Sequence, residues 1–80
     1  IQTCGVNLSV NQSEKLLFYT LGCKDVFDYV IYDLLGRKIS NGQMHSDGKI
    51  DLSNLSFGLF LLSVENSNGR QTQKFKFIIE

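Results

Sequence analysis

Apolar and polar residues alternate along much of the chain, in short runs separated by turn-forming residues. A period of two is typical of a β-strand that buries one face. Clusters of Asn, Asp, Ser and Gly interrupt the runs at intervals of about 8 to 12 residues, the spacing of a sandwich or barrel. We therefore predict seven strands: Val6–Val10, Lys15–Thr20, Val26–Tyr32, Arg37–Gln43, Lys49–Leu52, Leu59–Asn66 and Arg70–Ile79.

The last two predicted strands flank Asn68-Gly69, a dipeptide that favours a type I′ hairpin turn and so fixes their register. This register puts four large apolar side chains on one face, which we expect to be core. The predicted pairs are Phe60 with Phe77 and Leu62 with Phe75 on that face, and Leu61 with Lys76 and Ser63 with Lys74 on the other.

Asp33-Leu34-Leu35-Gly36 predicts a second hairpin, because Asp at the first position and Gly at the fourth suit a type I turn. A tight turn there pairs Val30 with Ile39 and Tyr32 with Arg37. The strand that leads into it, 27–32, is apolar on both faces and is therefore expected at the centre of its sheet.

Composition supports an all-β fold and a single domain. The chain has 80 residues with no Ala, Pro or Trp, and it is rich in β-branched and aromatic residues. Eight basic and eight acidic side chains cancel, which argues against non-specific binding to nucleic acid. No apolar run is long enough to cross a bilayer. The chain opens at Ile1 rather than Met, so we expect it to be part of a longer protein.

Cys4 and Cys23 flank the first two predicted strands. A turn at residues 11–14 leaves the two sulfur atoms within a bulge or a two-residue shift of bridging distance. A disulfide closing that loop would contribute about 3 kcal/mol and would fit an exported protein. The alternative is a pair of buried free thiols in a cytosolic domain.

No arrangement of residues indicates catalysis, a metal or a cofactor. The single histidine, His45, sits in a Gly-, Ser- and Asp-rich stretch and is expected to be an exposed loop residue. The aspartates lack the spacing of a calcium loop, and Asp51 is expected to bond backbone amides in the corner 51–55. If an aromatic ligand platform exists, its candidates are Tyr19, Tyr29 and Phe57.

From residue 29 onward, three blocks follow one another in a specific order: Val30-Ile31-Tyr32-Asp33-Leu34-Leu35-Gly36-Arg37, then Gly48-Lys49-Ile50-Asp51-Leu52-Ser53-Asn54-Leu55-Ser56-Phe57-Gly58, then Asn68-Gly69 with the closing Lys74-Phe75-Lys76-Phe77. Together they resemble the type A C-terminal sorting domain of the type IX (Por) secretion system of Bacteroidota. The resemblance is strong over residues 29–80. It is weaker over 1–28, where the family commonly has an Asn-Pro step and this chain has no proline.

The resemblance implies an immunoglobulin-like antiparallel β-sandwich of about seven strands, at the end of a larger exported protein. It implies a non-catalytic secretion signal that is read by the type IX translocon and shuttle and removed by a sortase. The passenger would precede it and would cross the periplasm on the way to the cell surface or the medium. Carried over by position, the family's motifs form three signatures: the first falls on Tyr32, Asp33, Gly36 and Arg37, the second on Asp51, Leu52, Leu55 and Gly58, and the terminal one on Lys74 and Phe75. The further motif residues Gly48, Gly69, Lys76 and Phe77 lie in the same blocks and are counted with these signatures.

A second function remains open, because the same sandwich occurs as a fibronectin-like accessory binding or spacer module of surface and carbohydrate-active proteins. That reading requires an exposed aromatic or polar ligand surface. Neither reading involves nucleic acid or a cofactor, and the sequence does not indicate an oligomeric state.

Overall fold

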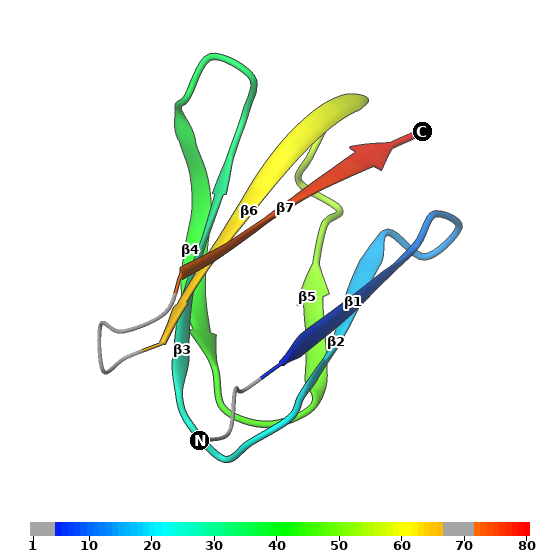
Figure 1. Cartoon of the computed structure of the whole chain (residues 1–80). Coiled ribbons are helices and arrows are strands. Elements are labelled where there is room, and N and C mark those ends of the chain that lie inside the picture. The colour runs from blue at the N-terminus through cyan, green and yellow to red at the C-terminus, as the bar shows by residue number, and fades with distance from the viewer. Residues whose placement is uncertain (1–4, 67–71) are drawn as a thin grey trace.

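The computed structural model describes residues 5–66 and 72–80. Within those ranges the chain forms seven β-strands and no helix, close to the strands predicted from the alternation (Figure 1). The strands are β1 (Val6–Asn11), β2 (Leu16–Leu21), β3 (Phe27–Tyr32), β4 (Lys38–Met44), β5 (Gly48–Asp51), β6 (Gly58–Asn66) and β7 (Thr72–Ile79). None of the described residues belongs to a helix that is long and apolar enough to cross a membrane.

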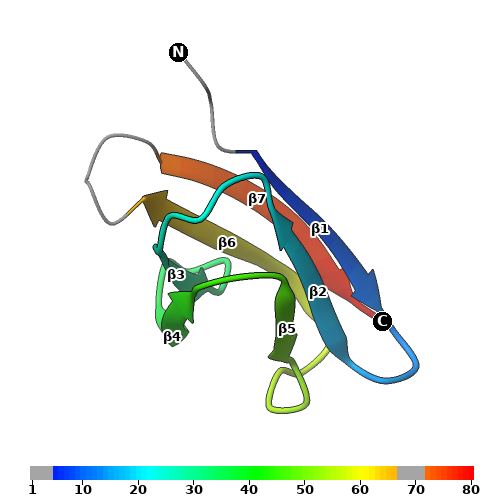
Figure 2. The same cartoon turned by 90° about the horizontal axis from the view of Figure 1, so that it is seen from below.

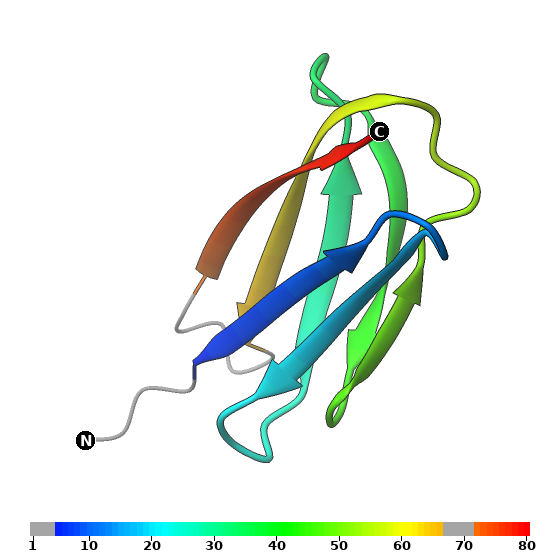
Figure 3. The same ribbon diagram turned by 90° about the vertical axis from the view of Figure 1, so that its right-hand side faces the viewer.

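The strands form two antiparallel sheets that face each other (Figures 2 and 3). One sheet has the order β1-β2-β5 and the other the order β4-β3-β6-β7. As expected, β3 is an internal strand, whereas β7 lies at an edge. The immunoglobulin-like β-sandwich is confirmed, with the fourth strand beside β3 rather than beside β5 as in constant-type domains.

The core lies between the two sheets and is made by the inward residues of both. Phe27, Ile31 and Leu62 of the larger sheet and Leu17 of the smaller one are at most 1% exposed. Leu52 and Leu55 close one end of the core from the β5–β6 connection. Burial of such side chains contributes about 1.5 to 3 kcal/mol each, opposed by the lost chain entropy.

The predicted register of the last hairpin is confirmed in all four pairs. Phe60 lies opposite Phe77, and their rings stack with centroids 5.8 Å apart. Both rings are buried, whereas Phe75 is only partly buried against the core. The turn residues Asn68 and Gly69 lie outside the described residues.

The predicted register of the β3–β4 hairpin is wrong. Val30 pairs with Asn41 rather than Ile39, and Tyr32 pairs with Lys38 rather than Arg37. The type I turn itself is present, because the Gly36 N–H donates to the carbonyl oxygen of Asp33 at 3.0 Å. The difference arises because Gly36, the last residue of that turn, adopts φ +82°, and because a bulge shifts the register again between Ile31 and Tyr32.

The register of the β1–β2 hairpin also differs from the one that the predicted turn would give, and again a loop residue has a positive φ. Its last loop residue, Lys15, has φ +53°, a conformation uncommon for residues other than glycine, and Asn11 pairs with Leu16. This register brings the backbones before β1 and after β2 together, with the Gly22 N–H donating to the Gly5 carbonyl oxygen at 2.8 Å.

Cys23 follows this contact directly and is disulfide-bonded. It is also partly buried against the core. Cys4 lies outside the described residues, so its predicted pairing with Cys23 stays a prediction. The turn expected from the sequence is tighter and leaves the two cysteines out of register. The observed register favours their pairing more strongly, because Val6 lies directly opposite Leu21.

Two glycines leave space for tyrosine rings on neighbouring strands. Gly48 pairs with Tyr19 and Gly42 pairs with Tyr29. A Cβ atom on Gly48 would lie 2.8 Å from the Tyr19 hydroxyl oxygen, and one on Gly42 would lie 2.9 Å from the Tyr29 ring. The signature residue Gly48 is therefore required by the packing of Tyr19, which is only 9% exposed.

We predict that Gly48→Ala lowers the free energy of unfolding by about 1 to 3 kcal/mol, because the added methyl group overpacks the buried Tyr19 ring. Gly5→Ala is the matched control, since no atom of the described residues lies within 4 Å of the place that its Cβ atom would take. Urea denaturation followed by tyrosine fluorescence measures both changes. Equal stability of the two variants would contradict the packing role of Gly48.

Candidate recognition surface

Two of the three signature segments meet at one end of the sandwich, which we call the upper end because it is uppermost in Figure 1. It is formed by the β3–β4 turn (residues 33–37), the β5–β6 loop (residues 52–57) and the last residues of β7. The end of β7 reaches it because Leu59 and Gly58 pair with Ile78 and Ile79. Strand β1 starts at the opposite end (Figure 3).

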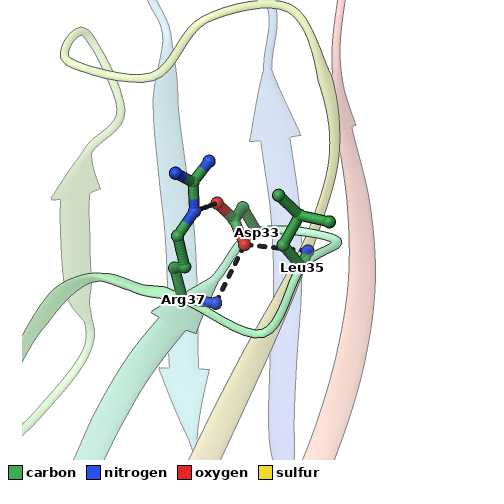
Figure 4. A network of polar contacts seen from close by, with 3 residues as sticks. All are labelled: Asp33, Leu35 and Arg37. Carbon is green, nitrogen blue, oxygen red and sulfur yellow. Dashed lines mark hydrogen bonds and ion pairs between the residues drawn. The ribbon is translucent and has the colours of Figure 1, made fainter.

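Asp33 organises the β3–β4 turn through its side chain (Figure 4). Its Oδ1 accepts hydrogen bonds from the backbone N–H groups of Leu35 and Arg37, each at 2.9 Å. Its Oδ2 accepts a bond from Arg37 Nε at 2.7 Å, which is also an ion pair. The hydrogen bond from the Arg37 backbone N–H is the main cause that lowers the pKa of Asp33; partial desolvation opposes it, and the Arg37 side chain reinforces it.

The Asp33–Arg37 pair fixes the loop and leaves the guanidinium accessible. The Arg37 side chain is 72% exposed, whereas that of Asp33 is 14% exposed. Tyr32, the remaining residue of this signature, is half-buried at the end of β3, opposite Leu61. Of this signature, Arg37 is therefore the side chain that offers most of its surface to a partner.

In the second signature, Asp51 bonds a backbone amide of the β5–β6 loop, as expected. The Oδ1 atom of Asp51 accepts a hydrogen bond from the backbone N–H of Ser53 at 2.9 Å, and hydrogen bonds from Ser53 lower the pKa of Asp51. Leu52 and Leu55 anchor the loop in the core, and the Leu55 N–H donates to the Leu52 carbonyl oxygen. Gly58 has φ +136°, a conformation that favours glycine, and starts β6.

A shallow depression of about 310 Å³ lies between these two signatures. Asp33, Arg37 and Gly58 line it, together with Leu34 and Leu35 from the turn. Leu34 is 67% exposed and Leu35 is 79% exposed. Sequence reasoning missed both leucines, although two apolar residues inside a polar turn could have indicated an exposed apolar tip.

The third signature lies on β7. Lys74 and Lys76 are exposed, whereas Phe77 is buried and Phe75 partly buried, so the strand has one face in the core and one in solvent. The side chain of Gln12, in the β1–β2 turn, holds the end of this strand. Its Nε2 donates to the Ile78 carbonyl oxygen at 2.7 Å, and its Oε1 accepts the Glu80 N–H at 3.0 Å.

Gln12 therefore joins the two sheets at the upper end and satisfies backbone groups on the outer edge of β7. Sequence reasoning missed this residue too, because nothing in a Gln-Ser pair between two strands indicates a contact more than 60 positions away. Of the predicted site residues, Cys4 and Gly69 lie outside the described ranges.

The other candidate residues of the sequence analysis do not come together in one site. His45 is exposed in the loop after β4, as expected. Of the three aromatic candidates, Tyr19 is buried, Tyr29 packs against the core, and only Phe57 is exposed, with Lys15 Nζ 6.0 Å from its ring centroid. Residues 5–66 and 72–80 contain no group of three or more potential metal ligands.

The lowered pKa of Asp33 predicts a pH-dependent contribution to stability. The carboxylate stabilises the turn above its unfolded-state pKa of about 3.9, and this contribution is lost as the pH falls through the lower folded-state pKa. We expect Asp33→Asn to be less stable than the wild type at pH 7, with the difference shrinking below about pH 4. Denaturant unfolding at several pH values measures it.

Glu80→Gln is the control for this prediction, because Glu80 is exposed and no hydrogen bond or ion pair of its side-chain carboxylate is seen within the described residues. It should leave the pH profile unchanged. A constant difference between Asp33→Asn and the wild type from pH 7 to pH 3 would contradict the role of the charge.

The comparison with protein families supplies the context for this surface. A family model described as "Secretion system C-terminal sorting domain" matches residues 6–80 and so includes all seven strands. No curated protein matches the chain. Because the matched region covers nearly the whole chain and contains the three signature segments in order, the chain belongs to the family of type IX (Por) secretion C-terminal sorting domains.

Proposed function

We propose that the folded domain acts as a non-catalytic address that the type IX translocon and its shuttle read on the upper end and on β7, and that a sortase then removes it. The observation that carries the proposal is the family match over residues 6–80. The depression that Asp33, Arg37 and Gly58 line together supports it. The coarse function follows from the family: a secretion signal attached to a passenger that transits the periplasm toward the surface or the extracellular space.

The placement of the two ends of the sandwich supports this proposal. Strand β1 starts at the lower end, and β7 finishes at the upper end (Figure 3). A passenger joined ahead of β1 would therefore be attached at the end of the sandwich opposite the Asp33–Arg37 turn and the β5–β6 loop. Such an attachment would leave the signature surface accessible.

Several signature residues maintain the fold rather than offer contacts. Asp33 and Asp51 bond backbone amides, and Gly58 adopts a positive φ. The exposed side chains left for direct recognition include Arg37, Lys74 and Lys76. We assign these three to contact with the secretion machinery and the others to shaping the surface.

The test fuses residues 1–80 behind a signal peptide and a fluorescent passenger in a type IX-competent bacterium. We expect fluorescence at the surface or in the medium, with the 80-residue tail missing from the exported product. In a translocon-null strain the passenger should stay in the periplasm. A fusion that ends at Asn66 lacks β7 and is the control for the signal itself.

Retention of the passenger in the periplasm of both strains would contradict the proposed function. Export of the fusion that ends at Asn66 at the wild-type level would contradict the part assigned to β7. Export with the tail still attached would contradict only the removal by a sortase and not the role in export.

A further inference from the structure

The outward face of the four-stranded sheet is apolar over its upper half. Outer faces of antiparallel sandwiches usually carry polar residues at these alternate positions. Here Ile39 is 42% exposed, Leu59 37% and Ile78 50%. The apolar outer face consists of Val30, Tyr32, Ile39, Leu59, Leu61 and Ile78.

Strand pairing makes these residues neighbours. Leu59 lies opposite Ile78, and Leu61 lies between Tyr32 on β3 and Lys76 on β7. The bulge in β4 leaves Ile39 without a direct partner on β3. Leu59 and Ile39 also line the depression at the upper end, so the apolar outer face and the signature turn form one continuous surface.

The opposite sheet provides a contrast within the same molecule. On its outer face, β1 presents Asn7 and Ser9, β2 presents Leu16, Phe18 and Thr20, and β5 presents Lys49 and Asp51. Polar residues outnumber apolar ones on that face, as is usual for a solvated sheet. The apolar character is therefore a property of the four-stranded sheet and not of the domain as a whole.

Charge is also unevenly distributed over the four-stranded sheet. Lys74 and Lys76 project beside the apolar outer face, and Lys38 lies opposite Tyr32. The Asp33–Arg37 pair is the only ion pair within residues 5–66 and 72–80, so neither β7 lysine has a carboxylate partner there. The acidic Asp28 and Glu65 face each other at the other end of the sheet.

We propose that the apolar outer face is the docking surface for a protein segment of the type IX export machinery that carries apolar side chains and carboxylates. This inference rests on the proposed function and names the surface and the partner chemistry. The apolar residues would supply the buried centre of the interface, and the cationic side chains of β7 would select an acidic partner. Because Lys74 belongs to the terminal signature, this surface also gives that motif a contact role.

The test compares export of the fluorescent fusion for variants on the two outer faces. Leu59→Thr with Ile78→Thr removes apolar area but places β-branched residues, which favour strands, at both positions, and we expect export to fall about tenfold or more. Phe18→Thr is the matched control, because Phe18 is 38% exposed but lies on the other sheet. It should be exported like the wild type.

A charge series keeps the test valid if the threonine variant does not fold. Lys74→Glu with Lys76→Glu should lose export to a similar extent, whereas Lys74→Arg with Lys76→Arg should retain it. Lys49→Glu, on the outer face of β5, is the control. Thermal unfolding of the purified domains shows which variants are folded.

Export of both folded variants at the wild-type level, with the wild-type fusion exported, would overturn this inference and the contact role assigned to Lys74 and Lys76. It would leave intact the proposal that the domain is a sorting address that is removed after export. Failure of the wild-type fusion would instead overturn the proposed function. A third outcome is that the purified domain binds anionic lipid vesicles and loses that binding in the Lys74→Glu, Lys76→Glu variant. That result would assign the apolar outer face to a membrane and overturn the proposal of a protein partner.

Discussion

The pairing of β6 with β7 is the interaction on which the rest of the domain depends. β6 has nine residues and pairs on one edge with β3 and on the other with β7. Its inward Phe60, Leu62 and Val64 are at most 6% exposed. Without β7, this central strand would lose a partner along its length and the stacking of Phe60 on Phe77.

The same pairing places the terminal signature within the fold instead of at a loose tail. Phe77 and Ile79 are buried between the sheets, and the Gln12 side chain holds the backbone of Ile78 and Glu80. The lysines between the buried residues then project at fixed positions beside the apolar outer face. Under the proposed function, the sorting signal is a surface with a defined geometry, produced by residues from distant parts of the chain.

Local patterns in the sequence were sufficient to predict the strands and the register of the last hairpin, because alternation and an Asn-Gly turn act over short distances. The spacing of the turns allowed a sandwich or a barrel, and the family resemblance implied the sandwich. The two other registers required the conformations of Lys15 and Gly36, and a positive φ on a lysine has no sequence indicator. The division into two sheets and the Gln12 contact depend on packing between distant segments. The sequence was sufficient to carry the family's motifs over to residues of this chain, which stays a prediction of their role. The distinction between residues that shape the fold and residues that are exposed needed the hydrogen bonds of Asp33 and Asp51.

The central claim is that the secretion machinery reads a folded surface, and the most direct test unfolds the domain without changing a signature residue. Leu17 is fully buried in β2 and belongs to no signature, so Leu17→Asp would bury an unpaired carboxylate and unfold the sandwich. Its neighbour Phe18→Asp is the control, because Phe18 points outward. We predict that the Leu17→Asp fusion keeps its passenger in the periplasm while the Phe18→Asp fusion is exported, with passenger fluorescence measured in every compartment. Export of the unfolded Leu17→Asp fusion at the wild-type level would show that a linear signal is read, and would contradict the account.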